Sequence, residues 1–377
     1  MGVIGRWQQP ELRRETFKRY KDMLSRVADN LYWMSRYMER AENLARLMLV
    51  STEMLLDSSA IGRRARGEYW MPILVATAME GAFAELYPRP GAADVARFFA
   101  LDARNPDSIL SCVRQARENA RTVRDQISDE MWTELNALHL FIGSAEGNEM
   151  HERSPQAFYE KVIQSSLLFD GITMATLSRT EGWQFLQLGR YLERADKTSR
   201  FLDIRTQAVE DLDALQQIQG STILRACSAA AAFRRMYGTD FGDANILEFL
   251  LLSMEFPRSV RFCVRTVDDI LHQISGTPTG QYSNGAEKVM GALLAKLNFA
   301  GVHEVLDWGV HQYIDELQTA FNAAGQEIFE KYVLMPREAN RLARVPGFDA
   351  SGYQALVERQ QQQQQQQQRH RVNLRGE

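Results

Sequence analysis

Two runs of arginine and glutamate contain the residues whose types and spacing could do chemistry. The run Arg36-Tyr37-Met38-Glu39-Arg40-Ala41-Glu42 returns as Arg190-Tyr191-Leu192-Glu193-Arg194-Ala195-Asp196. Guanidinium groups hold carboxylates or phosphates through paired hydrogen bonds, and a neighbouring glutamate can accept a proton or hold an amine. The runs therefore predict two sites that could bind such groups and act on them.

The glutamates Glu39 and Glu193 are the candidate acid/base catalysts of these sites. The candidate binding residues are the charged side chains around them, namely Arg36, Arg40, Glu42, Arg46, Arg190, Arg194, Asp196 and Arg200. At about 100° per helical residue, Arg36, Glu39, Asn43 and Arg46 fall on one stripe of a helix, away from its apolar stripe. The matching stripe of the second run holds Arg190, Glu193, Lys197 and Arg200.

Three interpretations of these charged stripes remain open. They are solvated helix faces with Arg and Glu paired three residues apart, or ion pairs between two packed helices that fix the register. Alternatively, both clusters face a common cleft that binds or converts a substrate. A solvated face does not require the same residues twice, so the other two are favoured, and the sequence does not separate them.

Other chemistry is weakly indicated. Glu304, Asp307, His311 and Asp315 have helical spacing and could offer metal ligands from one face, but acidic helices are common and no metal site is predicted. The glycine-containing loop 276–285 lacks the Lys-Ser/Thr pair of a phosphate-binding P-loop. The sequence identifies no cofactor.

The elements that carry the two runs are themselves repeated. Positions 36–46 and 190–200 share six identical residues of eleven at an offset of 154. A second block, 105–114, matches 256–265 at Pro, Ser, Cys, Val and Arg. Two blocks in the same order predict an internal duplication. Cys112 and Cys263 occupy matching positions, which favours core packing over reactivity.

Apolar residues step by three and four through 23–54, as in an amphipathic helix. Further helices are expected over 71–87, 92–103, 109–127, 130–142, 155–168, 181–209, 223–237, 246–254, 258–274, 288–297 and 302–332. No strand pattern is present. We therefore predict an all-α helical bundle of two tandem, similar halves.

The predicted organisation is an arm at 1–22, a first half at 23–150, a second half at 151–335 and a Gln-rich tail at 336–377. The polar stretch 143–154 is the expected seam, and 275–285 the expected internal loop. The tract 360–368 is glutamine alone and can bury little apolar surface.

The composition restricts location and partners. The chain has 377 residues with a net charge of −4, which gives no general attraction to nucleic acid or to an anionic membrane. Its three cysteines do not suggest a disulfide framework. No apolar run reaches the length of a membrane span, and the first residues lack a secretory signal pattern. A cytoplasmic protein is expected.

The motif set also resembles a known family. The stretches 24–42, 171–174, 181–196 and 256–262 are similar to the bacterial alpha-E domain family, an all-helical family with a Glu-Arg motif. The resemblance covers about residues 23–335. The family's characteristic positions fall on Arg36, Glu39, Arg40, Glu42, Glu193, Arg194 and Asp196, and no settled catalytic assignment comes with them.

The resemblance implies a pathway, since alpha-E proteins are typically encoded beside, or fused to, a circularly permuted ATP-grasp protein similar to amide or peptide ligases. A transglutaminase-like peptidase is often present as well. We therefore expect a partner of such a ligase that binds its amino-acid, peptide or phosphate-bearing substrate. The alternatives are an enzyme of the same pathway that uses Glu39 and Glu193, and a helical scaffold.

Overall fold

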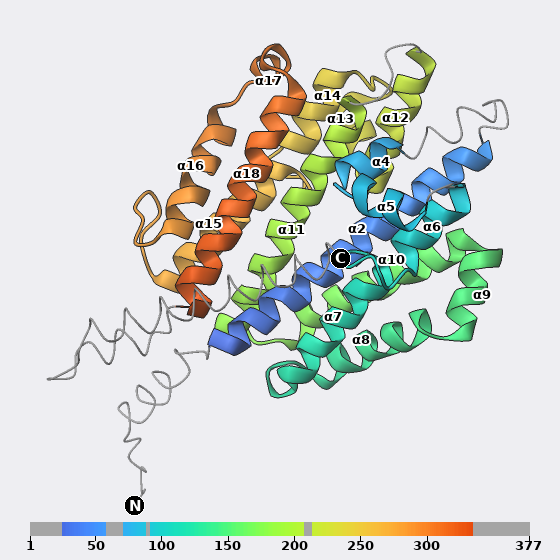
Figure 1. The fold of residues 1–377 in the computed structure, drawn as a ribbon. Coiled ribbons are helices and arrows are strands. Elements are labelled where there is room, and N and C mark those ends of the chain that lie inside the picture. The colour runs from blue at the N-terminus through green and yellow to red at the C-terminus, as the bar shows by residue number, and fades with distance from the viewer. Residues whose placement is uncertain (1–24, 58–70, 88–90, 207–212, 335–377) are drawn as a thin grey trace, which may run out of the picture.

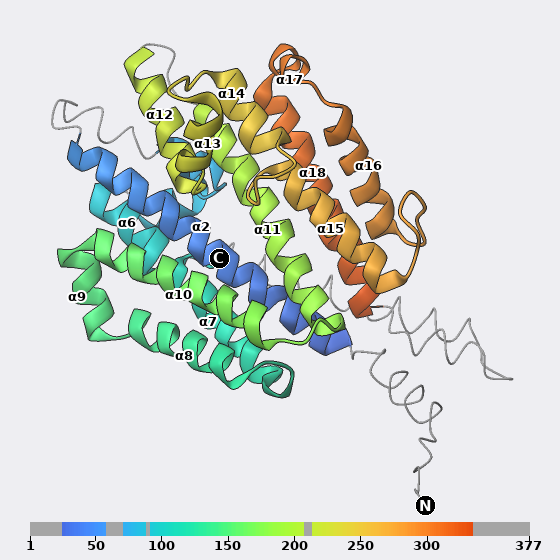
Figure 2. The same cartoon turned by 180° about the vertical axis from the view of Figure 1, so that it is seen from behind.

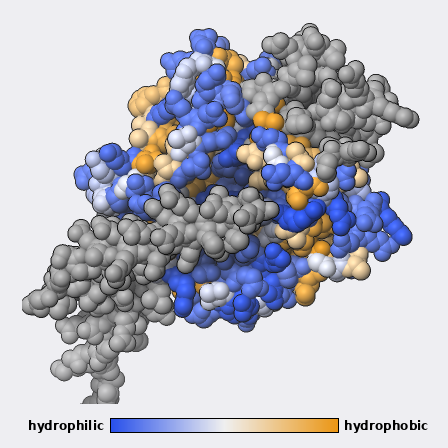
Figure 3. Space-filling model, viewed as in Figure 1, coloured by the Kyte–Doolittle hydropathy of each residue, from blue (hydrophilic) through white to orange (hydrophobic). Residues whose placement is uncertain are grey.

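The computed structural model describes residues 25–57, 71–87, 91–206 and 213–334, and within these ranges it is helical with no strand. The predicted all-α class is confirmed. The predicted arm and the Gln-rich tail lie outside the described residues. On the face shown in Figure 3, hydrophilic side chains predominate, with separate apolar patches among them.

Two long helices form the centre of the molecule (Figures 1 and 2). They are α2 (Ser25–Asp57) and α11 (Glu181–Thr206), and they share the most extensive helix–helix interface among the described elements. Each carries one Arg/Glu run. Both helices are surrounded by others, so that even charged positions of α2 and α11 are buried.

Two groups of helices flank α11 along the chain. Besides α2, the first comprises α4 (Met71–Ala76), α5 (Glu80–Leu86), α6 (Ala92–Ala100), α7 (Ile109–Thr122), η1 (Arg124–Gln126), α8 (Asp129–Ile142), α9 (Ala145–Arg153) and α10 (Pro155–Thr176). The second adds α12 (Asp213–Ala226), α13 (Ala230–Tyr237), α14 (Asp243–Leu247), the π-helix η2 (Glu248–Leu252), α15 (Val260–Ser275), α16 (Gly285–Phe299), α17 (Val302–Trp308), α18 (Val310–Phe329) and η3 (Glu330–Leu334). Helices α7 and α10 pack on α2, while α15 and α18 pack on α11.

Local features of the two halves correspond. Ser108 caps α7 by accepting the amide N–H of Ser111, and Ser259 caps α15 by accepting that of Phe262. The cysteines Cys112 and Cys263 are both fully buried and unpaired, so their predicted role in core packing is confirmed. The predicted duplication requires such correspondences, and the division near residue 150 stays a prediction.

Two of the expected helices are broken at matching places. Residues 71–87 form α4 and α5, because Ala78 adopts φ of 55°, and 223–237 likewise divides at Ser228 with φ of 54°. A left-handed residue cannot continue a right-handed helix. The apolar spacing runs through both turns, so it did not reveal either break.

Other expected bounds were also wrong. The polar stretch 143–154 contains helix α9, whose first turn is capped by the Ser144 hydroxyl, 3.0 Å from the amide nitrogen of Gly147. Helix α10 continues through Gly171 to Thr176, and 302–332 divides at Gly309, where φ is 104°. Residues 246–254 become α14 and η2. The loop 275–285 was predicted correctly, since α15 ends at Ser275 and α16 begins at Gly285.

No single helix among the described residues is long and apolar enough to cross a membrane. One pair, α16 with α17, meets the length and composition limits only jointly, and it bends by 104° at the break.

Candidate functional site

The two Arg/Glu runs meet at the interface of α2 and α11. Glu39 accepts hydrogen bonds from Nε and Nη2 of Arg194, at 2.8 and 2.7 Å. Glu193 accepts from Nε and Nη2 of Arg40, at 2.6 and 3.1 Å. Each glutamate is therefore held by the arginine of the other run. We call Glu39–Arg194 and Glu193–Arg40 the reciprocal ion pairs.

A glycine lets the two helices approach closely enough for these pairs. A Cβ atom built on Gly189 of α11 would lie 2.2 Å from the carbonyl oxygen of Tyr32 on α2. Beside it, the Ser35 hydroxyl donates to the carbonyl oxygen of Leu186 at 2.6 Å. Only a residue without Cβ fits this crossing point.

Further cations converge on the same two glutamates. Glu193 also accepts from Nε of Arg36 at 2.8 Å, and the ammonium of Lys197 lies 3.4 Å away. Glu39 also accepts from Nη1 of Arg258 at 3.1 Å. Glu193 thus pairs with three cationic side chains and Glu39 with two, all in a buried setting.

All ten predicted site residues take part in ion pairs that form two clusters, one around Glu193 and one around Glu39. We call the two clusters together the ion-pair network. Arg46 donates to Glu42 at 2.8 Å, Arg200 donates to Asp196 at 3.0 Å, and Arg190 pairs with Asp170. The members that sequence reasoning missed are Asp107, Asp170, Lys197 and Arg258. Asp107 and Arg258 occupy the same position of the repeated Pro-x-Ser block, which could have indicated a shared role. Because their charges are opposite, the repeat did not predict them as equivalent site residues.

Burial excludes one interpretation of the charged runs. Glu39 is 3% exposed and Glu193 is fully buried, so these positions are not solvated helix faces. Burial alone raises the pKa of a carboxyl, but Arg194 and Arg258 outweigh it and lower the pKa of Glu39. Arg40, Arg36 and Lys197 do the same for Glu193, whose pKa lies well below its ordinary value.

These carboxylates are poorly placed for acid/base chemistry. An efficient general base has a pKa near the working pH and a free oxygen within reach of a substrate. Both oxygens of Glu39 and of Glu193 already accept from arginine. The geometry favours ion pairs that fix the register of α2 against α11.

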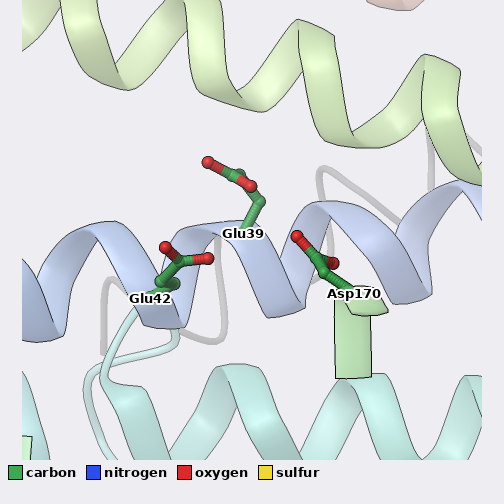
Figure 4. A group of neighbouring side chains, drawn as sticks. All are labelled: Glu39, Glu42 and Asp170. Atoms are coloured by element: carbon green, nitrogen blue, oxygen red, sulfur yellow. The ribbon is translucent and has the colours of Figure 1, made fainter. Parts of the chain in front are cut away.

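Three carboxylates gather beside the reciprocal ion pairs (Figure 4). Oxygens of Glu39, Glu42 and Asp170, from α2 and α10, lie within 4.8 Å of one another, a spacing that a metal ion could bridge. The same carboxylates already pair with Arg194, Arg258 and Arg190. Arginine side chains therefore neutralise these carboxylates in place of a metal ion, and the group is part of the ion-pair network.

The acidic residues near the C-terminal end of the described chain do not form a common face. Gly309 separates Glu304 and Asp307 on α17 from His311 and Asp315 on α18. Glu304 caps α17 by accepting the amide N–H of Gly301 at 3.0 Å. His311 Nδ1 lies 2.8 Å from Asp203 Oδ1. The helix break explains why the spacing 304, 307, 311, 315 misleads.

Asp170 gives the network a pH dependence. Burial and the nearby carboxylates of Glu39 and Glu42 raise its pKa to about 6, against the lowering effect of Arg190. Between pH 3.8 and 6 the folded chain keeps a proton on Asp170 that the unfolded chain releases, so this residue's contribution to stability falls as pH rises through that window. Glu39 and Glu193 act oppositely, since their lowered pKa values remove stability as the pH falls below about 4.3.

Asp170→Asn is expected to remove the fall in unfolding free energy that Asp170 causes between pH 4 and 7. Relative to the wild type, the variant should gain about 2 kcal/mol in unfolding free energy across that range, because the neutral amide has no proton to release. Urea unfolding at pH 4, 5, 6 and 7 measures it. Parallel curves for variant and wild type would contradict the assignment.

Among the described residues, two cavities contact members of the ion-pair network, and a third hollow lies away from it. One of about 40 Å³ contacts Arg40, Asp107 and Lys197, and one of about 320 Å³ contacts Arg36. A groove of about 1020 Å³ lies beside α13 and η2. Neither Glu39 nor Glu193 lines any of the three.

Comparison with known proteins places the chain among helical domains. A family model described as a predicted alpha-helical domain with a conserved ER motif matches residues 23–333. Uncharacterised proteins of Mycobacterium bovis and Mycobacterium tuberculosis are 24% identical over 324 residues, which is 80% of this chain and 36% of each relative. The chain thus spans about a third of the length of these relatives. No solved structure gives a significant match.

Proposed function

Because the chain belongs to the alpha-E family, we propose that it is a helical partner protein of an ATP-grasp amide or peptide ligase. In this proposal the reciprocal ion pairs hold the two halves together and take no part in proton transfer. The observation that carries this choice is the pairing of both oxygens of Glu39 and of Glu193 with buried arginine.

The mycobacterial relatives support a role in a larger assembly. They contain roughly three times the length of the matched region, so that region is joined there to further polypeptide. Alpha-E proteins are typically fused to an ATP-grasp protein or encoded beside one, and a fusion would account for the additional length. We propose a cytoplasmic complex with the ligase, and the net charge of −4 gives no general attraction to nucleic acid.

The test is co-purification and reconstitution with an ATP-grasp ligase from the same organism. A tagged chain is expected to retain that ligase, and ATP-dependent product formation from pooled amino acids is expected to fall when the chain is left out. A ligase that is fully active alone and does not bind the chain would overturn the proposal.

A second function, binding the ligase's substrate at the motifs, is favoured by one observation. Arg36 belongs to the first Arg/Glu run and lines the 320 Å³ cavity. The catalytic alternative for Glu39 and Glu193 has no comparable support, because neither residue lines a cavity described above.

A further inference from the structure

The 320 Å³ cavity lies where the beginning of α2 meets the end of α18 and η3, which are side by side in Figures 1 and 2. Six of its fourteen lining residues are aromatic, among them Trp33, Phe185 and Phe321. Its polar lining includes Asp29 and Arg36. A cavity of this size that combines aromatic walls with a few convergent polar groups is typical of small-molecule sites.

The two motif arginines that match in sequence differ in their partners. Arg190 pairs with Asp170, on α10. Its counterpart Arg36 faces α18 at Gly325, where a built Cβ atom would lie 3.7 Å from Arg36 Nη1. The two facing residues hold the same place in their helices, since 170 − 155 = 15 in α10 and 325 − 310 = 15 in α18. Where Arg190 has a carboxylate, Arg36 has a glycine and a cavity.

Arg36 is held in place and keeps one edge available. Its Nε donates to Glu193 at 2.8 Å and its Nη1 to the Tyr32 hydroxyl at 3.0 Å. Its guanidinium carbon lies 4.9 Å from the centre of the Trp33 ring. Within the described part of the chain, Nη2 makes no hydrogen bond. A fixed guanidinium with a free N–H edge is prepared for a carboxylate.

We propose that this cavity binds a carboxylate-bearing molecule with an aromatic or apolar body, of the class of aromatic amino acids and peptide C-termini. The ligand carboxylate takes the place at Arg36 that the Asp170 side chain has at Arg190, and the body packs among the aromatic walls. Asp29 lies seven residues before Arg36 on the same helical face and offers a partner for an ammonium group. The inference deepens the proposed function and rests on it for the biological source of the ligand.

The first experiment is titration calorimetry of the full chain with L-phenylalanine and with L-phenylalaninamide. Phenylalanine is expected to bind saturably at one site. Phenylalaninamide keeps the ring and the ammonium but loses the carboxylate, and should bind about tenfold more weakly or worse. No saturable binding of phenylalanine, or equal binding of both probes, would overturn the inference.

The matched variants are Gly325→Asp and Gly325→Ala. Aspartate supplies the missing carboxylate from α18 itself and should compete with the ligand, weakening phenylalanine binding about tenfold or more. Alanine adds only a Cβ at ordinary contact distance and should bind as the wild type does. Circular dichroism and thermal melting establish that both variants fold. Equal binding by the two variants would count against the site.

Co-purification separates this inference from the proposed function. A wild-type chain that retains the ligase but does not bind phenylalanine removes only the cavity assignment. A chain that binds phenylalanine through Arg36 but does not associate with the ligase removes only the partner proposal.

Discussion

Replacing Glu193 with glutamine is expected to lower the free energy of unfolding by about 3–5 kcal/mol. Glu193 is fully buried and accepts from Arg36 and Arg40, with Lys197 nearby. The variant leaves these cations in the interior without their shared anion, and an uncompensated buried charge is costly. Urea or guanidinium unfolding followed by circular dichroism at pH 7 measures the change.

Glu316→Gln is the matched control for this experiment. Glu316 also pairs with a cation, Lys296, but its side chain is 54% exposed. Exposed pairs contribute about 0–1 kcal/mol, so the control should unfold nearly as the wild type does. A stable Glu193→Gln protein that fails in reconstitution with the ligase would instead return Glu193 to the list of working site residues.

Gly189→Ala is expected to destabilise the fold by about 3 kcal/mol, because the helices cannot keep their separation. The new Cβ would lie 2.2 Å from the Tyr32 carbonyl oxygen and 2.4 Å from the Ser35 hydroxyl. Moving α11 outward would also lengthen the bonds of the reciprocal ion pairs. The thermal midpoint and the unfolding free energy both report the loss.

Gly171→Ala is the matched control, and it is expected to raise stability where Gly189→Ala lowers it. Gly171 lies within α10, and a Cβ there meets no atom within 4 Å. Alanine in a helix interior should stabilise by about 0.5–1 kcal/mol through the lower entropy of the unfolded chain. If both glycine variants changed stability equally, the close approach at Gly189 would not be the determinant.

Helix content and the two central helices were predictable from the sequence. Apolar residues that recur every three or four positions mark the buried face of a helix, and this pattern is local to each element. The breaks at Ala78 and Ser228 were not predictable, since a left-handed residue leaves no trace in apolar spacing when it is neither glycine nor asparagine. Helix α9 was missed for a related reason: its short, polar sequence resembles a loop, and its Ser144 cap alone is a weak signal.

The sequence predicted which residues make up the candidate site, but it did not show whether they form structural ion pairs or line a cleft. Spacing within a helix places Glu39 beside Arg36, but it cannot show that the nearest guanidinium belongs to Arg194, 155 residues further along. Asp170 joins the network from α10, which no motif linked to it, and Arg258 joins from the turn before α15. The interpretation as ion pairs that fix the register could be preferred only when both glutamates were seen buried and paired.

The reciprocal ion pairs also bear on the order of synthesis. When the first half leaves the ribosome, Glu39 has no arginine partner and Arg40 has only Asp107 until α11 emerges more than a hundred residues later. A polypeptide that closes its central contacts over so long a separation folds slowly and presents an unfinished, charged interior to the cell meanwhile. We therefore expect the first half to complete its folding only after α11 has been synthesised.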